Sequence, residues 1–363
     1  MLSTARSGFA LFLAAFSLQL SALAAPAEAQ PIGAGPIACG AGERSLNHEG
    51  YVRIGGIEQW VVVRGADCAN PVILWVHGGP GNPSTPFVNS PYRAWEKDFT
   101  IVQWDQRGAG RTYARNPVDP ETVEQILTVD GMSKDGAEVA QWAATYLKKP
   151  KLILMGGSWG SALGVHIAKA RPDLFVAYMG TGQLVKRTEN DEWSYKKTLG
   201  LARAAGDAKT VAMLEGLGAP PWNNPRAPGM MRRATRIYEA KATAPTPASW
   251  FEHGGAYATK QAQADYTNGE DFSWLQFVGM KGNGMQATLD VTKLGYDFAM
   301  PVFLVQGEQD LVTVPEVARR YFDAIKAPQK EYFLLPGVGH DPNPPMVDAQ
   351  YRILKSRVLP LLK

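Results

Sequence analysis

One short motif has the residue types and spacing of a nucleophilic serine. Residues 156–160 read Gly-Gly-Ser-Trp-Gly, which fits the pattern G-x-S-x-G. The motif lies between an apolar run that predicts a strand (151–155) and a segment that predicts a helix (159–170), which is the context it needs. Its glycines allow a tight turn, and a helix N-terminus favours the negative charge of an oxyanion. The pattern therefore predicts that Ser158 is a nucleophile in acyl transfer.

A serine hydroxyl needs a base to take its proton and an acid to orient that base. We favour His340 as the base, because it follows a late predicted strand in a glycine-containing loop. We favour Asp310 as the acid, since it follows the predicted strand 301–306, whereas the rival Glu308 lies nearer the strand end. The chain order serine, aspartate, histidine is one of the known orders of such a triad.

The transition state also needs backbone donors for the oxyanion. Residues 77–81 read His-Gly-Gly-Pro-Gly and follow the predicted strand 71–76. Because glycine has no Cβ, its N–H can approach a substrate closely. The candidate donors are the N–H groups of Gly79 and Trp159, and Gly78 is a candidate for contact with the substrate.

Short buried strands alternating with helices must position these residues. The predicted strands lie at 51–53, 57–63, 71–76, 99–104, 151–155, 174–179, 301–306 and 331–335. This alternation predicts an α/β fold with a mostly parallel sheet flanked by helices. From 185 to 297 the pattern becomes helix-like, which predicts an inserted helical cap between two parts of one core, 25–184 and 298–363. An independent second domain is disfavoured because strands return after this segment.

Composition excludes several classes of protein. The chain has 363 residues, 45% hydrophobic and 20% charged, so it can form a sizeable core. A net charge of +3 without basic runs argues against a nucleic-acid partner. Two cysteines cannot form a four-cysteine zinc site, and no H-E-x-x-H spacing occurs. The sequence therefore implies neither a metal nor another cofactor.

The first residues resemble a secretory signal peptide. Arg6 precedes an uncharged run, 9–25, and small residues at 22–24 offer a cleavage site, with a second at 27–29. We expect residues 1–24 to be removed and the product to be exported, periplasmic or secreted, without membrane contact; an uncleaved anchor is the alternative. In that compartment Cys39 and Cys68 either form a disulfide or remain separate buried thiols.

Three motifs together resemble the proline iminopeptidase family of serine peptidases, which has the α/β-hydrolase fold. They are residues 77–81, 104–111 (Trp-Asp-Gln-Arg-Gly-Ala-Gly-Arg) and 156–161. The resemblance implies an aminopeptidase that releases N-terminal proline beneath a helical cap. It also implies the same roles for the residues named above: Ser158 as nucleophile, His340 as base, Asp310 as its acid, and Gly79 and Trp159 as oxyanion donors. Asp105 and Arg107 would brace the surrounding loops.

The cap departs from the family pattern. Family members carry a Trp-Glu segment whose glutamate meets the substrate's amino group, and this cap lacks it. Glu192, Glu252 and the pair 270–271 lie beside aromatic residues and are candidates for holding an ammonium group, although each also fits a solvated acid on a helix. The partner is a peptide or a small acyl substrate, so a carboxylesterase or non-prolyl amidase with the same triad remains the alternative. The sequence does not indicate an oligomeric state.

Overall fold

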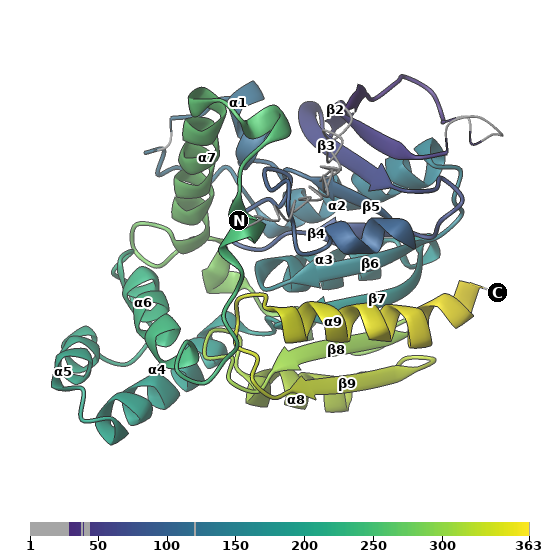
Figure 1. Cartoon of the computed structure of the whole chain (residues 1–363). Coiled ribbons are helices and arrows are strands. Elements are labelled where there is room, and N and C mark those ends of the chain that lie inside the picture. Colours follow the sequence, from purple (N-terminus) through teal and green to yellow (C-terminus); the bar gives the residue numbers. More distant parts are fainter. Residues whose placement is uncertain (1–28, 38, 40–43, 120, 363) are drawn as a thin grey trace, which may run out of the picture.

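A computed structural model describes residues 29–37, 39, 44–119 and 121–362 (Figure 1). The expected signal peptide, 1–24, lies outside these residues. Within them the backbone forms a nine-stranded sheet. Its strands are β1 (Gln30–Pro31), β2 (Leu46–Ile54), β3 (Ile57–Gly65), β4 (Val72–Val76), β5 (Thr100–Trp104), β6 (Leu152–Gly157), β7 (Phe175–Thr181), β8 (Val302–Gly307) and β9 (Lys330–Leu335).

The sheet is mostly parallel, as predicted. Its strand order is β1-β2-β3-β5-β4-β6-β7-β8-β9. The antiparallel pairs are β2 with β3 and β3 with β5, and the remaining neighbours are parallel. Parallel strands share a carboxyl edge, so the loops after β4, β6 and β8 emerge at the same side of the sheet.

Helices cover both faces of the sheet. On β6, Leu152 and Leu154 face one hydrophobic cluster, and Ile153 and Met155 face the other, as the period of a strand requires. The first cluster includes side chains of α2 (Val129–Tyr146), α3 (Trp159–Ala170) and α8 (Pro315–Ala324); the second includes those of α9 (Pro344–Ile353). The core therefore consists of two layers separated by the sheet.

Helix α2 begins earlier than the sequence pattern indicates. The apolar spacing of the sequence predicts a helix over 135–147, whereas α2 starts at Val129. Thr128 is the N-cap, and its Oγ1 accepts a hydrogen bond from the N–H of Gly131 at 3.0 Å. The first turn, with Asp130 and Gly131, lacks the apolar spacing that reveals a helix in a sequence.

The segment between β7 and β8 is helical. It contains α4 (Arg187–Ala204), α5 (Ala208–Leu217), α6 (Ala227–Glu239) and α7 (Lys260–Val278). These helices gather at one end of the sheet, at the left of Figure 1. Leu199, Leu214, Met231 and Ala234 form a separate small core within this segment. We call residues 185–297 the cap segment.

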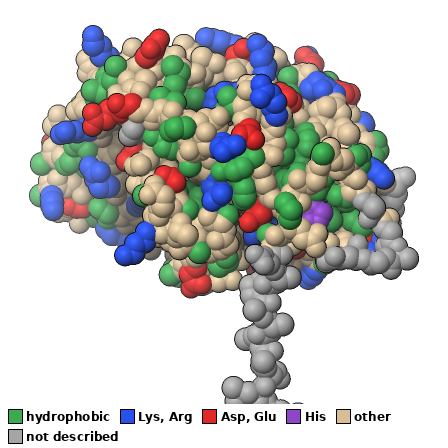
Figure 2. Space-filling model, turned by 90° about the horizontal axis from the view of Figure 1, so that it is seen from above, with side chains coloured by type: hydrophobic (Ala, Val, Ile, Leu, Met, Phe, Trp, Pro, Cys, Tyr) green, Lys and Arg blue, Asp and Glu red, His purple; other side chains and the backbone are tan. Residues whose placement is uncertain are grey.

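Two surface properties bear on partners. On the face that Figure 2 shows, Lys and Arg side chains are interspersed with Asp and Glu. Neither sign of charge forms a continuous surface on that face. In the part of the chain that the structure describes, none of the helices combines the length and hydropathy needed to cross a membrane.

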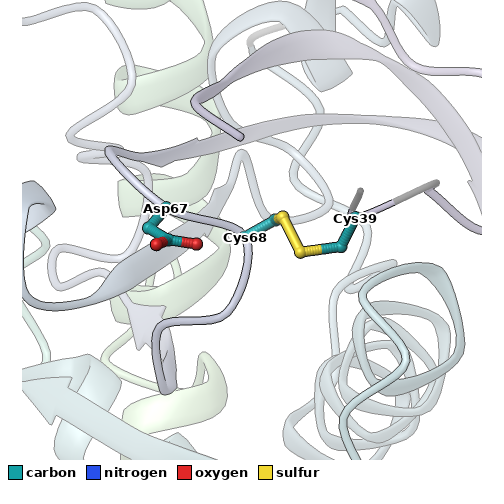
Figure 3. A group of neighbouring side chains, drawn as sticks. All are labelled: Cys39, Asp67 and Cys68. Carbon is teal, nitrogen blue, oxygen red and sulfur yellow. A yellow bond between two sulfur atoms is a disulfide. The ribbon is translucent and has the colours of Figure 1, made fainter. Parts of the chain in front are cut away.

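Cys39 and Cys68 form a disulfide, with their Cα atoms 5.7 Å apart (Figure 3). This decides a pairing that the sequence left open. The carboxylate of Asp67 lies beside it, and these three residues form a group whose ligand atoms are close enough for a metal ion. Both sulfur atoms are engaged in the disulfide, however, and the Asp67 carboxylate binds Arg44 with N–O distances of 2.8–3.1 Å. The two sulfur atoms and the carboxylate of this group therefore already have bonding partners other than a metal ion.

Candidate active site

Ser158 occupies a strained turn between β6 and α3. Its φ of 54° and ψ of −124° are rare for a residue with a side chain. The flanking glycines make the turn possible: a Cβ at Gly156 would lie 2.2 Å from the carbonyl oxygen of Gly160, and one at Gly160 would lie 2.0 Å from that of Val76. The turn therefore holds the serine above the carboxyl edge of the sheet, where its side chain is partly exposed.

His340 lies between Ser158 and Asp310. Its Nε2 is 3.0 Å from Oγ of Ser158, and its Nδ1 is 3.1 and 3.2 Å from the two carboxylate oxygens of Asp310. Burial alone would lower the pKa of His340, but the charge and hydrogen bond of Asp310 outweigh it, so the pKa is raised. Burial would likewise raise the pKa of Asp310, but His340 and nearby donors leave it lowered. The pair thus favours an ionised carboxylate beside a basic imidazole.

Asp310 is held by donors that its position in the sequence does not reveal. Its Oδ1 accepts from the N–H groups of Val312 and Thr313, both at 2.8 Å. Its Oδ2 accepts from Oγ1 of Thr313 at 2.7 Å and from Nε2 of Gln306 at 3.0 Å. The rival acid Glu308 is exposed and bonds to Gln309. Asp310, not Glu308, is therefore the carboxylate that faces the histidine.

The loop after β4 lies against the serine turn. A Cβ at Gly78 would approach Cβ of Ser158 to 3.3 Å, and Gly79 has a φ of 107°, which favours glycine. His77 is buried, which lowers its pKa to about 4. Its Nε2 accepts from the N–H of Gln106 at 3.2 Å, so it serves as a neutral structural group. The predicted donor segments at Gly79 and Trp159 are thus neighbours in space.

Asp105 and Arg107 connect distant segments. The carboxylate of Asp105 is fully buried and accepts hydrogen bonds from Thr85, from Tyr257 in the cap segment, and from the N–H of Arg111 at 2.8 Å. Burial raises the pKa of Asp105 to about 6. Arg107 donates to Asp135 at 2.8 and 3.0 Å. Both residues brace the architecture around the site.

The candidate acids of the cap segment occupy different positions. Glu192 is exposed on α4; Glu252 is also exposed and accepts from Nδ2 of Asn89 at 2.9 Å. Glu270, on α7, is half-buried, and a Cβ added at Gly81 would lie 3.0 Å from its Cα. Burial raises the pKa of Glu270, while a hydrogen bond from Asn82 opposes this. Of these three acids, only Glu270 lies directly against the glycine loop.

Glu239, at the end of α6, was not indicated by the sequence. It is 5% exposed, and its Oε1 accepts from the N–H of Leu311 at 2.8 Å, next to Asp310. Burial and the charge of Asp310 raise its pKa, whereas His340 and Arg232 lower it. No local motif marks Glu239, because the contact arises only when the cap segment packs on the core.

Comparisons with known proteins agree with this architecture. Residues 71–344 match the family model described as alpha/beta hydrolase fold. A "Probable aminopeptidase YbaC" of Bacillus subtilis is 28% identical over 301 residues, which cover 80% of this chain and 89% of the relative. A "Proline iminopeptidase" of Neisseria gonorrhoeae is 24% identical, covering 87% of this chain and 97% of the relative.

Among solved structures, a proline iminopeptidase of Mycobacterium smegmatis superimposes with a TM-score of 0.57 at 21% identity. The match covers 86% of this chain and 96% of that one. The fold and the resemblance predicted from the three motifs are thereby confirmed.

Proposed function

The chain belongs to the α/β-hydrolase fold family, and on that premise we propose that it is a serine aminopeptidase that releases N-terminal proline, or a related residue, from peptides. The observation that carries the proposal is the distance of 3.0 Å between Oγ of Ser158 and Nε2 of His340. A hydroxyl on a strained turn within hydrogen-bond reach of an oriented imidazole is the arrangement of an activated nucleophile. Relatives named aminopeptidase and proline iminopeptidase support the substrate class.

The proposed reaction follows from these contacts. His340 Nε2 takes the proton of Ser158 as Oγ bonds to the acyl carbon, and Asp310 stabilises the imidazolium. The N–H groups of Gly79 and Trp159 stabilise the oxyanion. The imidazolium then protonates the leaving amine as the C–N bond breaks. Water, deprotonated by the same histidine, attacks the acyl-enzyme and regenerates the serine.

We propose Glu270 as the group that binds the substrate's α-ammonium. Its backbone lies against the glycine loop, and its carboxyl is half-buried. Within the described part of the chain no Lys or Arg lies within ion-pair distance of it, and burial raises its pKa against the opposing charge of Arg236. An incoming ammonium would favour its charged form. Glu270→Gln should therefore raise KM for free-amine substrates much more than for N-acetylated ones. A larger effect of Glu192→Gln or Glu252→Gln would contradict this assignment.

The first experiment compares the wild-type protein with Ser158→Ala on a proline arylamide, an alanine arylamide and a short-chain nitrophenyl ester. We expect preferential cleavage of the proline amide, and a loss of several orders of magnitude in the variant. Ser356→Ala, which replaces an exposed serine, is the matched control. Cleavage of the ester alone would replace the proposal with a carboxylesterase. Full activity of Ser158→Ala would exclude the serine mechanism.

We also propose that the protein is exported after removal of residues 1–24. The disulfide between Cys39 and Cys68 supports this, since disulfides persist in oxidising compartments. Fractionation of producing cells, followed by N-terminal sequencing of the recovered protein, tests the proposal. Recovery from the cytosol with residues 1–24 still attached would refute it.

A further inference from the structure

A cavity outside the triad lies between two helices of the cap segment. It has a volume of about 530 Å³. Five of its lining residues come from the start of α6 and the loop before it, and the sixth comes from α7: Pro225, Arg226, Gly229, Met230, Arg233 and Trp274. The lining combines apolar side chains with two guanidinium groups, so the cavity suits a ligand with both an apolar part and a negative charge.

The two arginines of the cavity differ from the other arginines of α6. Arg232 and Arg236 form ion pairs with Asp341. Arg226 and Arg233 are exposed, and neither forms an ion pair with an Asp or Glu of the described chain. Two guanidinium groups are thus free to bind a carboxylate, for which their planar donors are well suited.

Gly229 keeps the floor of the cavity open. A Cβ added there would meet only Nη1 of Arg233, at 3.9 Å. The guanidinium therefore lies over the glycine rather than extending away from the helix. Trp274 is half-buried on the opposite side and offers a rigid apolar surface.

The cavity and the triad lie at opposite ends of α6. Glu239, at the far end of α6, bonds to the residue after Asp310. With a rise of 1.5 Å per residue, Arg233 lies about 9 Å and Arg226 about 20 Å from Glu239 along the helix axis. An extended peptide advances about 3.3–3.6 Å per residue, so these distances correspond to roughly three to six residues.

Aromatic contacts link the same two places. The ring of Trp274 lies 6.0 Å from that of Phe277, which lies 5.4 Å from the ring of Trp159, the residue after the nucleophile. The cavity thus lies two ring contacts from the serine turn, and the intervening Phe277 and Trp159 are buried core side chains.

We propose that this cavity is a subsite for a carboxylate at the far end of a short peptide whose N-terminal residue lies at Ser158. The inference rests on the proposed peptidase function and deepens it: the enzyme prefers oligopeptides of about three to six residues that end in, or carry, a negative charge there. Arg226 and Arg233 bind the carboxylate, and Trp274 and Met230 contact the adjacent side chain. The carboxylate is either the peptide's C-terminus or an acidic side chain.

The test compares kcat/KM for Pro-Ala-Ala-Ala-Ala as the free acid, the same peptide as the C-terminal amide, and an amide with glutamate at position four. We expect the wild-type protein to prefer the free acid over the amide by roughly three- to tenfold at low salt, mainly through KM. The double variant Arg226→Gln/Arg233→Gln should bring this ratio close to one. High salt should reduce it in the wild type.

Lys209→Gln is the matched control, because it removes one exposed positive charge from α5 of the same cap segment, away from the cavity. It should keep the wild-type ratio. A preference for the glutamate peptide amide over the plain amide would identify an acidic side chain as the source of the carboxylate.

The outcomes separate the two proposals. Cleavage of the proline arylamide with equal rates for all three peptides would overturn the subsite alone. A charge preference that survives in the double variant would also overturn it. Failure to cleave either the arylamide or any peptide would overturn the proposed function and the peptide occupant together.

Discussion

The side-chain oxygen of Gln106 accepts a hydrogen bond from the indole N–H of Trp159 at 3.0 Å. The amide nitrogen of the same side chain donates to the carbonyl oxygen of His77 at 2.9 Å. Gln106 is 1% exposed, so neither bond competes with water. One side chain thus links the turn that carries Ser158 to the glycine loop, the two segments proposed to donate to the oxyanion.

Replacing Gln106 with leucine removes both bonds at similar volume. Because an oxyanion hole acts in the transition state, we expect kcat to fall roughly 10- to 100-fold with little change in KM. Gln106→Glu keeps an acceptor for Trp159 but sets a buried carboxylate oxygen against the carbonyl oxygen of His77, so it should lower kcat at least as much. Steady-state kinetics with thermal unfolding of each variant would show this. Loss of stability with unchanged kcat would indicate a purely structural role.

As the pH is lowered, activity should be half lost at a pH above 6.5, the ordinary pKa of histidine. We call this decline in activity the acid limb of the pH profile. His340 must be neutral to accept the serine proton, and Asp310 and Glu239 raise its pKa above 6.5 against the opposing effects of burial and Arg232. Activity is therefore lost as the pH falls through that raised pKa. The pH dependence of kcat/KM on the proline arylamide measures it. A limb centred at or below 6.5 would contradict this reading of the pair.

Glu239→Gln tests the same electrostatics without touching the triad. The amide can still accept the hydrogen bond from Leu311, but the negative charge is gone. The acid limb should move to lower pH while the plateau kcat is largely retained. Glu308→Gln, which neutralises an exposed acid two residues before Asp310, is the control. An unmoved limb in Glu239→Gln would show that Glu239 does not influence His340.

The sequence pattern led to the candidate site at the positions where residue type and local spacing point to the same chemistry. Residues 156–160 predict a tight turn, because side chains at Gly156 and Gly160 would collide with the backbone. The residue at the centre of that turn is Ser158. The alternation of strands and helices predicted the sheet for the same reason: burial on both faces requires continuous apolar strands. His340 and Asp310 followed from chain order and loop position.

The supporting residues were beyond a local reading. Gln106 and Glu239 act through contacts across 53 and 72 residues, and nothing beside them in the chain marks the partner. The cap acids show the same limit: Glu192, Glu252 and Glu270 all lie near aromatic residues in the sequence. Only the packing of the folded chain distinguishes Glu192 and Glu252, which are exposed, from Glu270, which is half-buried.

Breaking the disulfide should destabilise the fold without altering the triad. Cys39 and Cys68 are 29 residues apart, and a cross-link over a loop of this size contributes about 2–4 kcal/mol. We expect Cys39→Ser/Cys68→Ser to lower the free energy of unfolding by that amount, with kcat/KM retained when folded. Reductant should destabilise the wild type but not the variant. Equal sensitivity of both proteins to reductant would contradict the pairing.

The buried carboxylate of Asp105 should make stability depend on pH in an unusual direction. Its pKa rises from 3.8 to about 6 on folding, chiefly through burial, so the folded state holds a proton that the unfolded chain has released. Stability from this group is therefore greatest at acidic pH and falls as the pH rises from about 4 to about 6, by about 3 kcal/mol.

Asp105→Asn isolates this effect, because asparagine does not ionise. Urea unfolding at intervals between pH 4 and pH 7 gives the stability of the wild type minus that of the variant, which cancels the titration of other groups. This difference should fall as the pH rises. Asp348→Asn, which replaces an exposed aspartate, controls for the loss of a charge alone. A difference that stays constant or grows with pH would show that Asp105 is ionised in the fold at no cost, held by Thr85, Tyr257 and the N–H of Arg111.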